Sequence, residues 1–212
     1  MRTEMVAQNI LIEHQDGKIP AYLSEPPSGE MVGVIVISAI FGVDDDTQRI
    51  CDRLADAGYP AMALNMFWQD DTDAGPLSGA EHEKAKARSL RVDRKDGNVY
   101  VEAAISKMKS INTCNGKIAV FGFCYGGPYV VEAAARYGID GGVVFHGSYV
   151  EKFLPEFKNI NCPIEFHYGD NDPIAPMSAI EIVKKECDKQ ENRDIFVYSG
   201  GEHGYMFPNR GA

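Results

Sequence analysis

The chain has 212 residues, of which 44% are hydrophobic and 25% charged, and its formal net charge at pH 7 is −10. This length predicts one domain, and the composition excludes disordered, collagen-like and coiled-coil proteins. The acidic balance disfavours nucleic acids and membrane surfaces as partners, because both carry negative charge.

The five cysteines predict neither a disulfide framework nor a zinc site, because no two of them have Cys-x-x-Cys spacing. The first residues lack an apolar core of signal-peptide length, and the longest apolar stretch is too short to span a bilayer. We therefore expect a protein of a reducing compartment, the cytoplasm, that holds no metal.

Short apolar runs alternate with helical patterns along the chain. The runs on either side of Asp16-Gly17 predict an N-terminal antiparallel hairpin. The β-branched run 32–38 predicts a strand buried on both faces, and the acids that follow predict the start of a helix. The later predicted strands, separated by helices, are 60–64, 118–121, 142–145, 164–168 and 195–198. This alternation predicts an α/β fold with a mostly parallel sheet and an antiparallel start.

The segment 67–90 interrupts the alternation with an acidic part followed by a basic part. Long insertions of this kind are usually functional, and this one follows the carboxyl end of a strand, where ligands bind in α/β folds. We expect residues 1–212 to form one domain in which 67–90 is an insertion, or a lid, beside the site.

A glycine-rich turn, 122–127, joins a predicted strand to a predicted helix and reads Gly-Phe-Cys-Tyr-Gly-Gly. It matches the pattern of a nucleophile on a sharp turn between two glycines, with Cys124 as the nucleophile. The backbone N–H of Tyr125 would face a developing oxyanion, and the helix N-terminus would favour a thiolate. By itself the turn also fits an inert buried cysteine.

An acid and a histidine follow two later strands. Asp172 comes after the strand that ends at Tyr168, and His203 comes after the strand that ends at Tyr198. A nucleophile, an acid and a histidine thus occur in the order used by α/β-hydrolases. His203 would deprotonate the cysteine, and Asp172 would orient the imidazole. Asp170 is a rival for the acid, and a turn or helix-capping role is the alternative for Asp172.

With these segments the sequence resembles the dienelactone hydrolase family, the cysteine branch of the α/β-hydrolases. The matching stretches are VIVISAIFG, GFCYGG, FHGS, HYGDNDPIAP and GEHGYMFP, and the resemblance covers nearly the whole chain. It implies a three-layer α/β-hydrolase fold that hydrolyses small esters or lactones without a cofactor. It also implies a triad of Cys124, Asp172 and His203, with an oxyanion hole formed by the backbone N–H groups of Ile40 and Tyr125.

The sequence departs from the family pattern in three places. Ala39 stands where a carboxylate is usual, and Tyr205 lies in the stretch after the histidine where an arginine is often found. The nearest arginine is Arg210. Nine residues follow His203, where the resemblance leads us to expect a closing helix.

The residues predicted to line a substrate pocket are Ala39, Phe41, Trp68, Arg88 and His146. Three of them have simpler interpretations. Trp68 could anchor the insertion, Arg88 and Arg91 could form a solvated face, and His146 could be a strand-end histidine bonded to backbone. The expected partner is a small ester or lactone. The rival function is that of a non-catalytic small-molecule binder or a thiol redox sensor with the same fold.

Overall fold

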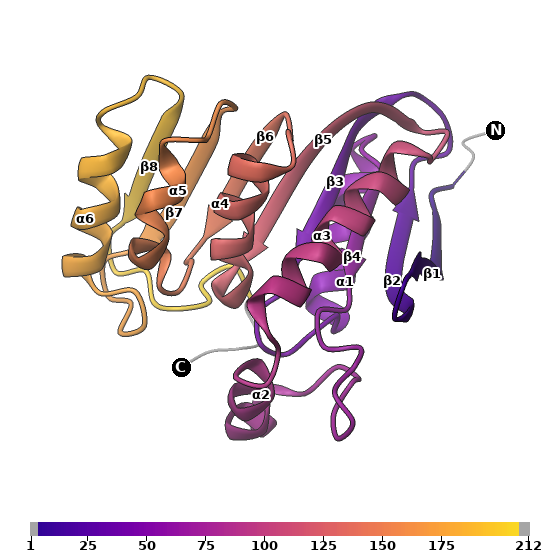
Figure 1. The fold of residues 1–212 in the computed structure, drawn as a ribbon, viewed down its shortest axis with the longest axis horizontal. Coiled ribbons are helices and arrows are strands. Elements are labelled where there is room, and N and C mark those ends of the chain that lie inside the picture. Colours follow the sequence, from indigo (N-terminus) through magenta and orange to yellow (C-terminus); the bar gives the residue numbers. More distant parts are fainter. Residues whose placement is uncertain (1–3, 208–212) are drawn as a thin grey trace. The chain divides into compact units, whose positions relative to one another are not determined.

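The computed structural model describes residues 4–207, which form two compact units, 4–119 and 120–207. Each unit alternates strands with helices, as the labels of Figure 1 show along the chain. The α/β class predicted from the sequence is therefore confirmed within each unit. The expectation of a single domain over 1–212 stays a prediction.

The strands of the first unit begin with the predicted hairpin, in which β1 (Val6–His14) pairs antiparallel with β2 (Gly17–Glu25). The next strands are β3 (Met31–Ile37) and β4 (Ala61–Leu64). Strand β4 lies between β2 and β3, antiparallel to the first and parallel to the second. The sheet thus changes from antiparallel to parallel at β4. The sequence predicted the antiparallel start and the parallel strands, but not the strand at which the change occurs.

Two helices cover this sheet, namely α1 (Asp45–Asp56) and α3 (Arg94–Lys109). On one face, the Tyr22 hydroxyl of β2 donates to Asp52 of α1 over 2.8 Å. On the other face, a Cβ added to Gly33 of β3 would lie 2.4 Å from a side-chain carbon of α3, so a glycine is needed there. The two helices therefore lie on opposite faces, which explains why β3 and β4 are almost wholly buried.

The insertion 67–90 follows β4 and contains a 3-10 turn, η1 (Gly79–Glu81), and the short helix α2 (His82–Ser89). Arg88 of this helix is fully buried. Its guanidinium donates to the backbone carbonyls of Ile40, Asp73 and Gly75. It also lies over the Phe67 ring, 4.1 Å from the centroid. The interpretation of Arg88 as part of a solvated face is therefore wrong, because its charge holds the insertion together.

Strand β5 (Cys114–Phe123) runs from the first unit into the second. The elements that follow are η2 (Cys124–Gly126), α4 (Gly127–Arg136), β6 (Gly141–Phe145), η3 (Val150–Phe153), α5 (Leu154–Phe157), β7 (Ile164–Gly169), α6 (Met177–Cys187) and β8 (Arg193–Tyr198). Strands β6, β7 and β8 are parallel neighbours in that order. Their carboxyl ends therefore lie at one edge of the second unit, where the chemistry was predicted.

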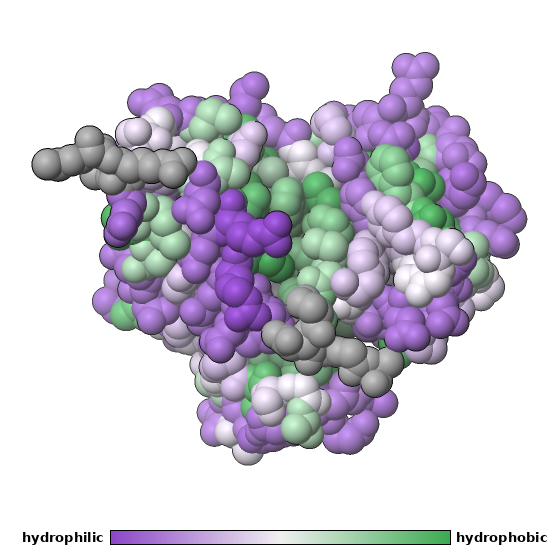
Figure 2. Space-filling model, turned by 180° about the vertical axis from the view of Figure 1, so that it is seen from behind, coloured by the Kyte–Doolittle hydropathy of each residue, from purple (hydrophilic) through white to green (hydrophobic). Residues whose placement is uncertain are grey.

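Polar residues dominate the face drawn in Figure 2, which agrees with the formal charge of −10, and smaller apolar areas lie between them. Within residues 4–207, no helix has both the length and the apolar character needed to cross a membrane.

Candidate active site

Cys124 lies directly after β5, at the start of η2, with a backbone φ of 51°. This left-handed conformation is costly for a residue with a side chain, and such strain concentrates at functional sites. A Cβ on Gly122 would lie 2.5 Å from both the Gly126 carbonyl oxygen and a Val130 methyl group. The turn can therefore form only with glycine at 122, which is the steric demand inferred from the sequence.

The loops after β7 and β8 are joined by backbone contacts. A Cβ on Gly169 would lie 2.0 Å from the Gly201 carbonyl oxygen, so the two chains approach as closely as glycine allows. The Asn171 N–H donates to that same oxygen over 3.0 Å. Asp170, the rival acid, accepts the Gly200 N–H over 2.6 Å. Asp170 thus ties one loop to the other.

Asp172 combines the two roles weighed for it. Its Oδ1 accepts the backbone N–H groups of Ile174 and Ala175, as in a turn that precedes a helix. Its Oδ2 lies 2.7 Å from His203 Nδ1. Asp172 is 3% exposed, and these hydrogen bonds fix the position of its carboxylate. Asp172 therefore both stabilises the turn and binds the histidine.

The electrostatics of this pair favour charge on both members. Burial raises the pKa of Asp172, but the hydrogen bond from His203 and the two backbone donors hold it below its usual value. Burial lowers the pKa of His203, but hydrogen bonding and charge from Asp172 and Cys124 raise it to about 10. His203 is therefore an imidazolium at neutral pH.

The other ring nitrogen of His203, Nε2, is buried. Cys124 raises the pKa of this imidazole by hydrogen bonding and by charge, so the thiol interacts directly with the ring. Cys124, Asp172 and His203 thus lie together in the second unit. A buried imidazolium that interacts with a carboxylate and with a thiol is suited to proton transfer.

His146 lies at the end of β6, with its ring centroid 4.9 Å from that of His203. It is 1% exposed, and neither of its ring nitrogens has a partner among the described residues. Burial, followed by the charge of His203, lowers the pKa of His146 to about 3. Two neighbouring imidazoles thus differ in charge, with His146 neutral and His203 protonated. The backbone N–H of His146 donates to the His167 carbonyl, but its ring bonds to no backbone group among the described residues, so the simpler interpretation does not account for the ring.

Tyr125, predicted to contribute to the oxyanion hole, follows Cys124 in η2, and the other remaining predicted residues among those described belong to the first unit. Ala39 and Phe41, beyond β3, are buried, and the carbonyl of Ile40 accepts from Arg88. The Trp68 ring meets those of His14 and Tyr100 edge-on. The pocket and oxyanion-hole roles of these residues stay predictions. Arg210 lies outside the described residues.

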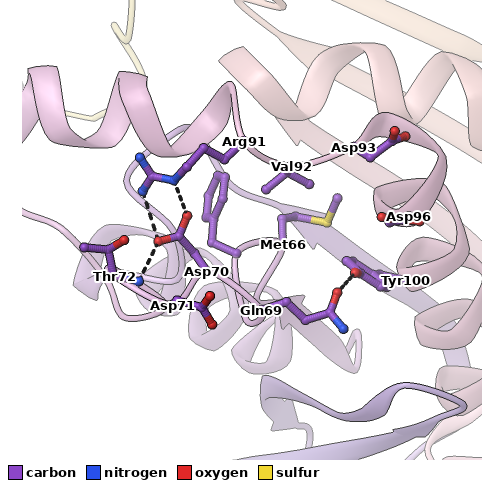
Figure 3. Close-up of a pocket in the computed structure, with 11 residues that line it drawn as sticks. Met66, Gln69, Asp70, Asp71, Thr72, Arg91, Val92, Asp93, Asp96 and Tyr100 are labelled. Atoms are coloured by element: carbon purple, nitrogen blue, oxygen red, sulfur yellow. Dashed lines mark hydrogen bonds and ion pairs between the residues drawn. The ribbon is translucent and has the colours of Figure 1, made fainter.

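A cavity of about 350 Å³, which the sequence did not predict, lies in the first unit. Figure 3 shows the side chains around it, contributed by Met66, Phe67, Gln69, Asp70, Asp71, Thr72, Arg91, Val92, Asp93, Asp96 and Tyr100. Arg91 pairs with Asp70 on one side and holds the pKa of that carboxyl at about 2. No member of the Cys124 cluster lines this cavity. Within residues 4–207, no three acidic, histidine or cysteine side chains gather as a metal site.

The model of the dienelactone hydrolase family matches residues 19–212. The chain belongs to the dienelactone hydrolase family. It is 26% identical to carboxymethylenebutenolidase 1 of Cupriavidus pinatubonensis, over 87% of this chain and 80% of that protein. It is 27% identical to carboxymethylenebutenolidase of Pseudomonas sp. (strain P51), over 93% and 84%.

Solved structures of the dienelactone hydrolase family share the fold. A putative dienelactone hydrolase from Klebsiella pneumoniae superposes with a TM-score of 0.83 at 22% identity, covering 96% of this chain and 89% of that one. A dienelactone hydrolase from Anabaena variabilis gives a TM-score of 0.76 at 13% identity, covering 98% and 92%. The fold is therefore that of the α/β-hydrolases, as predicted, and the chain is a hydrolase of the ester and lactone class.

Proposed function

We propose that the chain hydrolyses a small carboxylic ester or lactone through an acyl-cysteine intermediate. Cys124 is the nucleophile, His203 moves the protons, and Asp172 orients and stabilises the imidazolium. No cofactor takes part in these steps. The observation that carries the proposal is the Asp172–His203 hydrogen bond of 2.7 Å beside a strained cysteine, within a family of ester and lactone hydrolases.

In the first half-reaction, the Cys124 thiolate attacks the carbonyl carbon of the substrate and forms a C–S bond. The carbonyl oxygen becomes an oxyanion, which accepts the backbone N–H of Tyr125 and, by the family resemblance, that of Ile40. The intermediate collapses and the C–O bond to the leaving oxygen breaks. His203 donates its Nε2 proton to that oxygen, which leaves as an alcohol, or as the hydroxyl end of an opened lactone.

In the second half-reaction, the neutral imidazole of His203 takes a proton from water, and the resulting hydroxide attacks the thioester carbonyl. The C–S bond breaks and the acid product leaves. Cys124 returns to a thiolate and His203 to an imidazolium. The resting ion pair is therefore restored without an outside proton donor, which agrees with the raised pKa of His203.

The test uses a panel of neutral and carboxylate-bearing esters and lactones, with the wild type and the Cys124→Ala variant. We expect turnover by the wild type only, and an added acyl mass on the peptide that contains Cys124 after a rapid quench. Cys162→Ala is the matched control, because this cysteine is buried elsewhere in the same unit. Full turnover by Cys124→Ala would contradict the proposal.

The rival function, a thiol redox sensor, gives a different result in the same assay. A sensor would form a reversible sulfenic acid on Cys124 and would turn over none of the esters. A non-catalytic binder would retain the substrates unchanged. The hydrogen-bonded Asp172–His203 pair favours the hydrolase, because a sensor needs a reactive thiolate but no oriented proton carrier beside it.

A further inference from the structure

The loop that follows β6, residues 146–149, is pressed against the Cys124 turn. A Cβ on Gly127 would lie 2.7 Å from the Gly147 Cα, and a Cβ on Gly147 would lie 2.5 Å from a Val144 methyl group. Two glycines thus permit a backbone contact that no other residues would allow. The Ser148 N–H donates to the Cys124 carbonyl over 3.0 Å, so the loop is also hydrogen-bonded to the nucleophile's own peptide group.

The backbone of this loop is strained at both ends. His146 has a φ of 40° and Tyr149 a φ of 61°. Among the described residues, Cys124 is the only other non-glycine residue with a positive φ. Strain of this kind persists only where the surrounding structure imposes it, and it concentrates at functional sites. Within residues 4–207, every non-glycine residue with a positive φ therefore lies either in the Cys124 turn or in the 146–149 loop, and these two segments are in contact.

The side chain held between the two strained residues is that of Ser148. It is 6% exposed, and its Oγ lies 3.3 Å from Cys124 Sγ. Either atom could donate in a thiol–hydroxyl pair, but a thiolate can only accept. Because His203 is an imidazolium, the arrangement that fits the site is a Ser148 hydroxyl that donates its hydrogen to a Cys124 thiolate.

We propose that Ser148 is a positioning residue whose hydroxyl donates to the resting thiolate of Cys124 and fixes the direction of its sulfur. The inference rests on the proposed function of Cys124 as the nucleophile, and it adds a partner that the sequence motifs did not assign. Ala39 stands where the family resemblance leads us to expect a carboxylate, and Ser148 supplies the sulfur with a neutral donor from another segment. A donor favours the thiolate, whereas a carboxylate disfavours it.

The charged and titratable groups of the second unit that bear on this sulfur are few. His203 faces it directly, Asp172 acts through His203, and His146 packs on the His203 ring. The Ser148→Ala variant changes none of them and retains the backbone N–H that bonds to the Cys124 carbonyl. It therefore removes only the hydroxyl, and the loop is expected to stay in place.

The experiment measures the rate of alkylation of Cys124 by iodoacetamide between pH 5 and 9, with the modified peptide identified by mass. At pH 6 we expect Ser148→Ala to react about fivefold more slowly than the wild type, because less thiolate is present. At pH 9 we expect an equal or faster rate, because a thiolate without a donor is the stronger nucleophile. Loss of folding would instead move the rates at all pH values in one direction.

Ser24→Ala is the matched control, because Ser24 is also buried and its hydroxyl donates to a sulfur, that of Met5, in the first unit. Its alkylation profile should coincide with that of the wild type. Ser148→Thr, which keeps a hydroxyl, should recover most of the rate at pH 6. Coincident profiles for Ser148→Ala and the wild type would overturn the inference, even if Cys124→Ala had confirmed the nucleophile. Activity in Cys124→Ala would instead overturn the proposed function.

Discussion

The insertion of the first unit and the cysteine cluster of the second unit use buried polar groups in opposite ways. In the insertion, the buried Arg88 gives its donors to three backbone carbonyls. In the cluster, both ring nitrogens of His146 and the Tyr205 hydroxyl are buried and have no partner among the described residues. Both arrangements remove polar atoms from water, but the terminal nitrogens of Arg88 are compensated by backbone carbonyls, whereas these three atoms are not.

This difference separates groups that stabilise a structure from groups that are available to a reacting molecule. An unpaired buried donor costs free energy of folding, so it persists where another function requires it. On this view Arg88 should affect stability and His203 should affect turnover, although both were candidate site residues from the sequence. The following predictions test that separation.

The largest effect is expected from the cysteine cluster. Cys124→Ala and His203→Ala should each lower kcat/KM by about a thousandfold or more, because the two side chains act as one unit. Asp172→Asn should leave about ten times more activity, because the acid only orients and stabilises the imidazole. Steady-state kinetics on the best ester of the panel measures this order. Equal, mild losses in all three variants would contradict the triad.

Arg88→Met should lower the free energy of unfolding by about 3–4 kcal/mol, because three carbonyls lose their donor in a buried place. The kcat/KM of the folded fraction should change little. Arg91→Met is the matched control, since the Arg91 side chain is 46% exposed and solvent screens its ion pair with Asp70, which should therefore contribute much less to stability than Arg88 does. Urea unfolding of both variants measures the difference. A loss of activity that is specific to anionic substrates, with unchanged stability, would instead indicate that Arg88 binds substrate.

The contribution of the His203 imidazole to stability should fall as the pH rises from about 6.5 to about 10. The pKa of His203 is about 10 in the folded chain and about 6.5 when unfolded, so this ring holds more proton in the folded state over that range. Its contribution is complete below pH 6.5 and lost by about pH 10.

His203→Gln should remove that alkaline dependence, measured as the difference between the two unfolding curves at each pH. His146→Phe is the control for the dependence of stability on acid pH. Because the pKa of His146 is lowered to about 3, its contribution is present above pH 6.5 and lost as the pH falls towards 3. The His146→Phe variant should therefore weaken only the fall in stability at acid pH. An unchanged alkaline slope in His203→Gln would contradict the ion pair.

Trp68→Ala should give the smallest effect on folding, about 1–2 kcal/mol, because the ring contacts His14, Tyr100 and the Gly17 turn but is partly exposed. If Trp68 also lines the substrate pocket, as the sequence predicted, the preference among acyl groups should shift as well. Chemical denaturation and the ester panel together measure the two effects. A stability loss with an unchanged acyl preference would make Trp68 an anchor of the first hairpin only.

Regular features of the fold could be predicted because each has a local cause. The hairpin follows from Asp16-Gly17, and the parallel strands follow from continuous β-branched runs such as that in β3. The elements η3 and α5 were not predicted. They are short, and η3 follows directly after Tyr149, whose left-handed backbone results from packing rather than from any preference of tyrosine.

The cysteine, the acid and the histidine were also placed by local signals, since each follows the end of a strand. Ser148 also follows the end of a strand, in the FHGS stretch, but its contact with Cys124 depends on the pairing of Gly127 with Gly147, which no spacing in the sequence reveals. The burial of Arg88 was missed for the same reason. A charged residue in a polar segment reads as solvated until the carbonyls that surround it are known.

Trp68 is the only tryptophan in the chain, and it lies in the first unit, whereas Cys124, Asp172 and His203 lie in the second. Its intrinsic fluorescence therefore reports on the unit that does not contain Cys124. Followed during denaturation beside the loss of esterase activity, this natural probe measures the cooperativity between the two units. Coincident transitions would mean that they melt as one body, and a fluorescence change that lagged behind inactivation would reveal an intermediate in which only the second unit has lost its order.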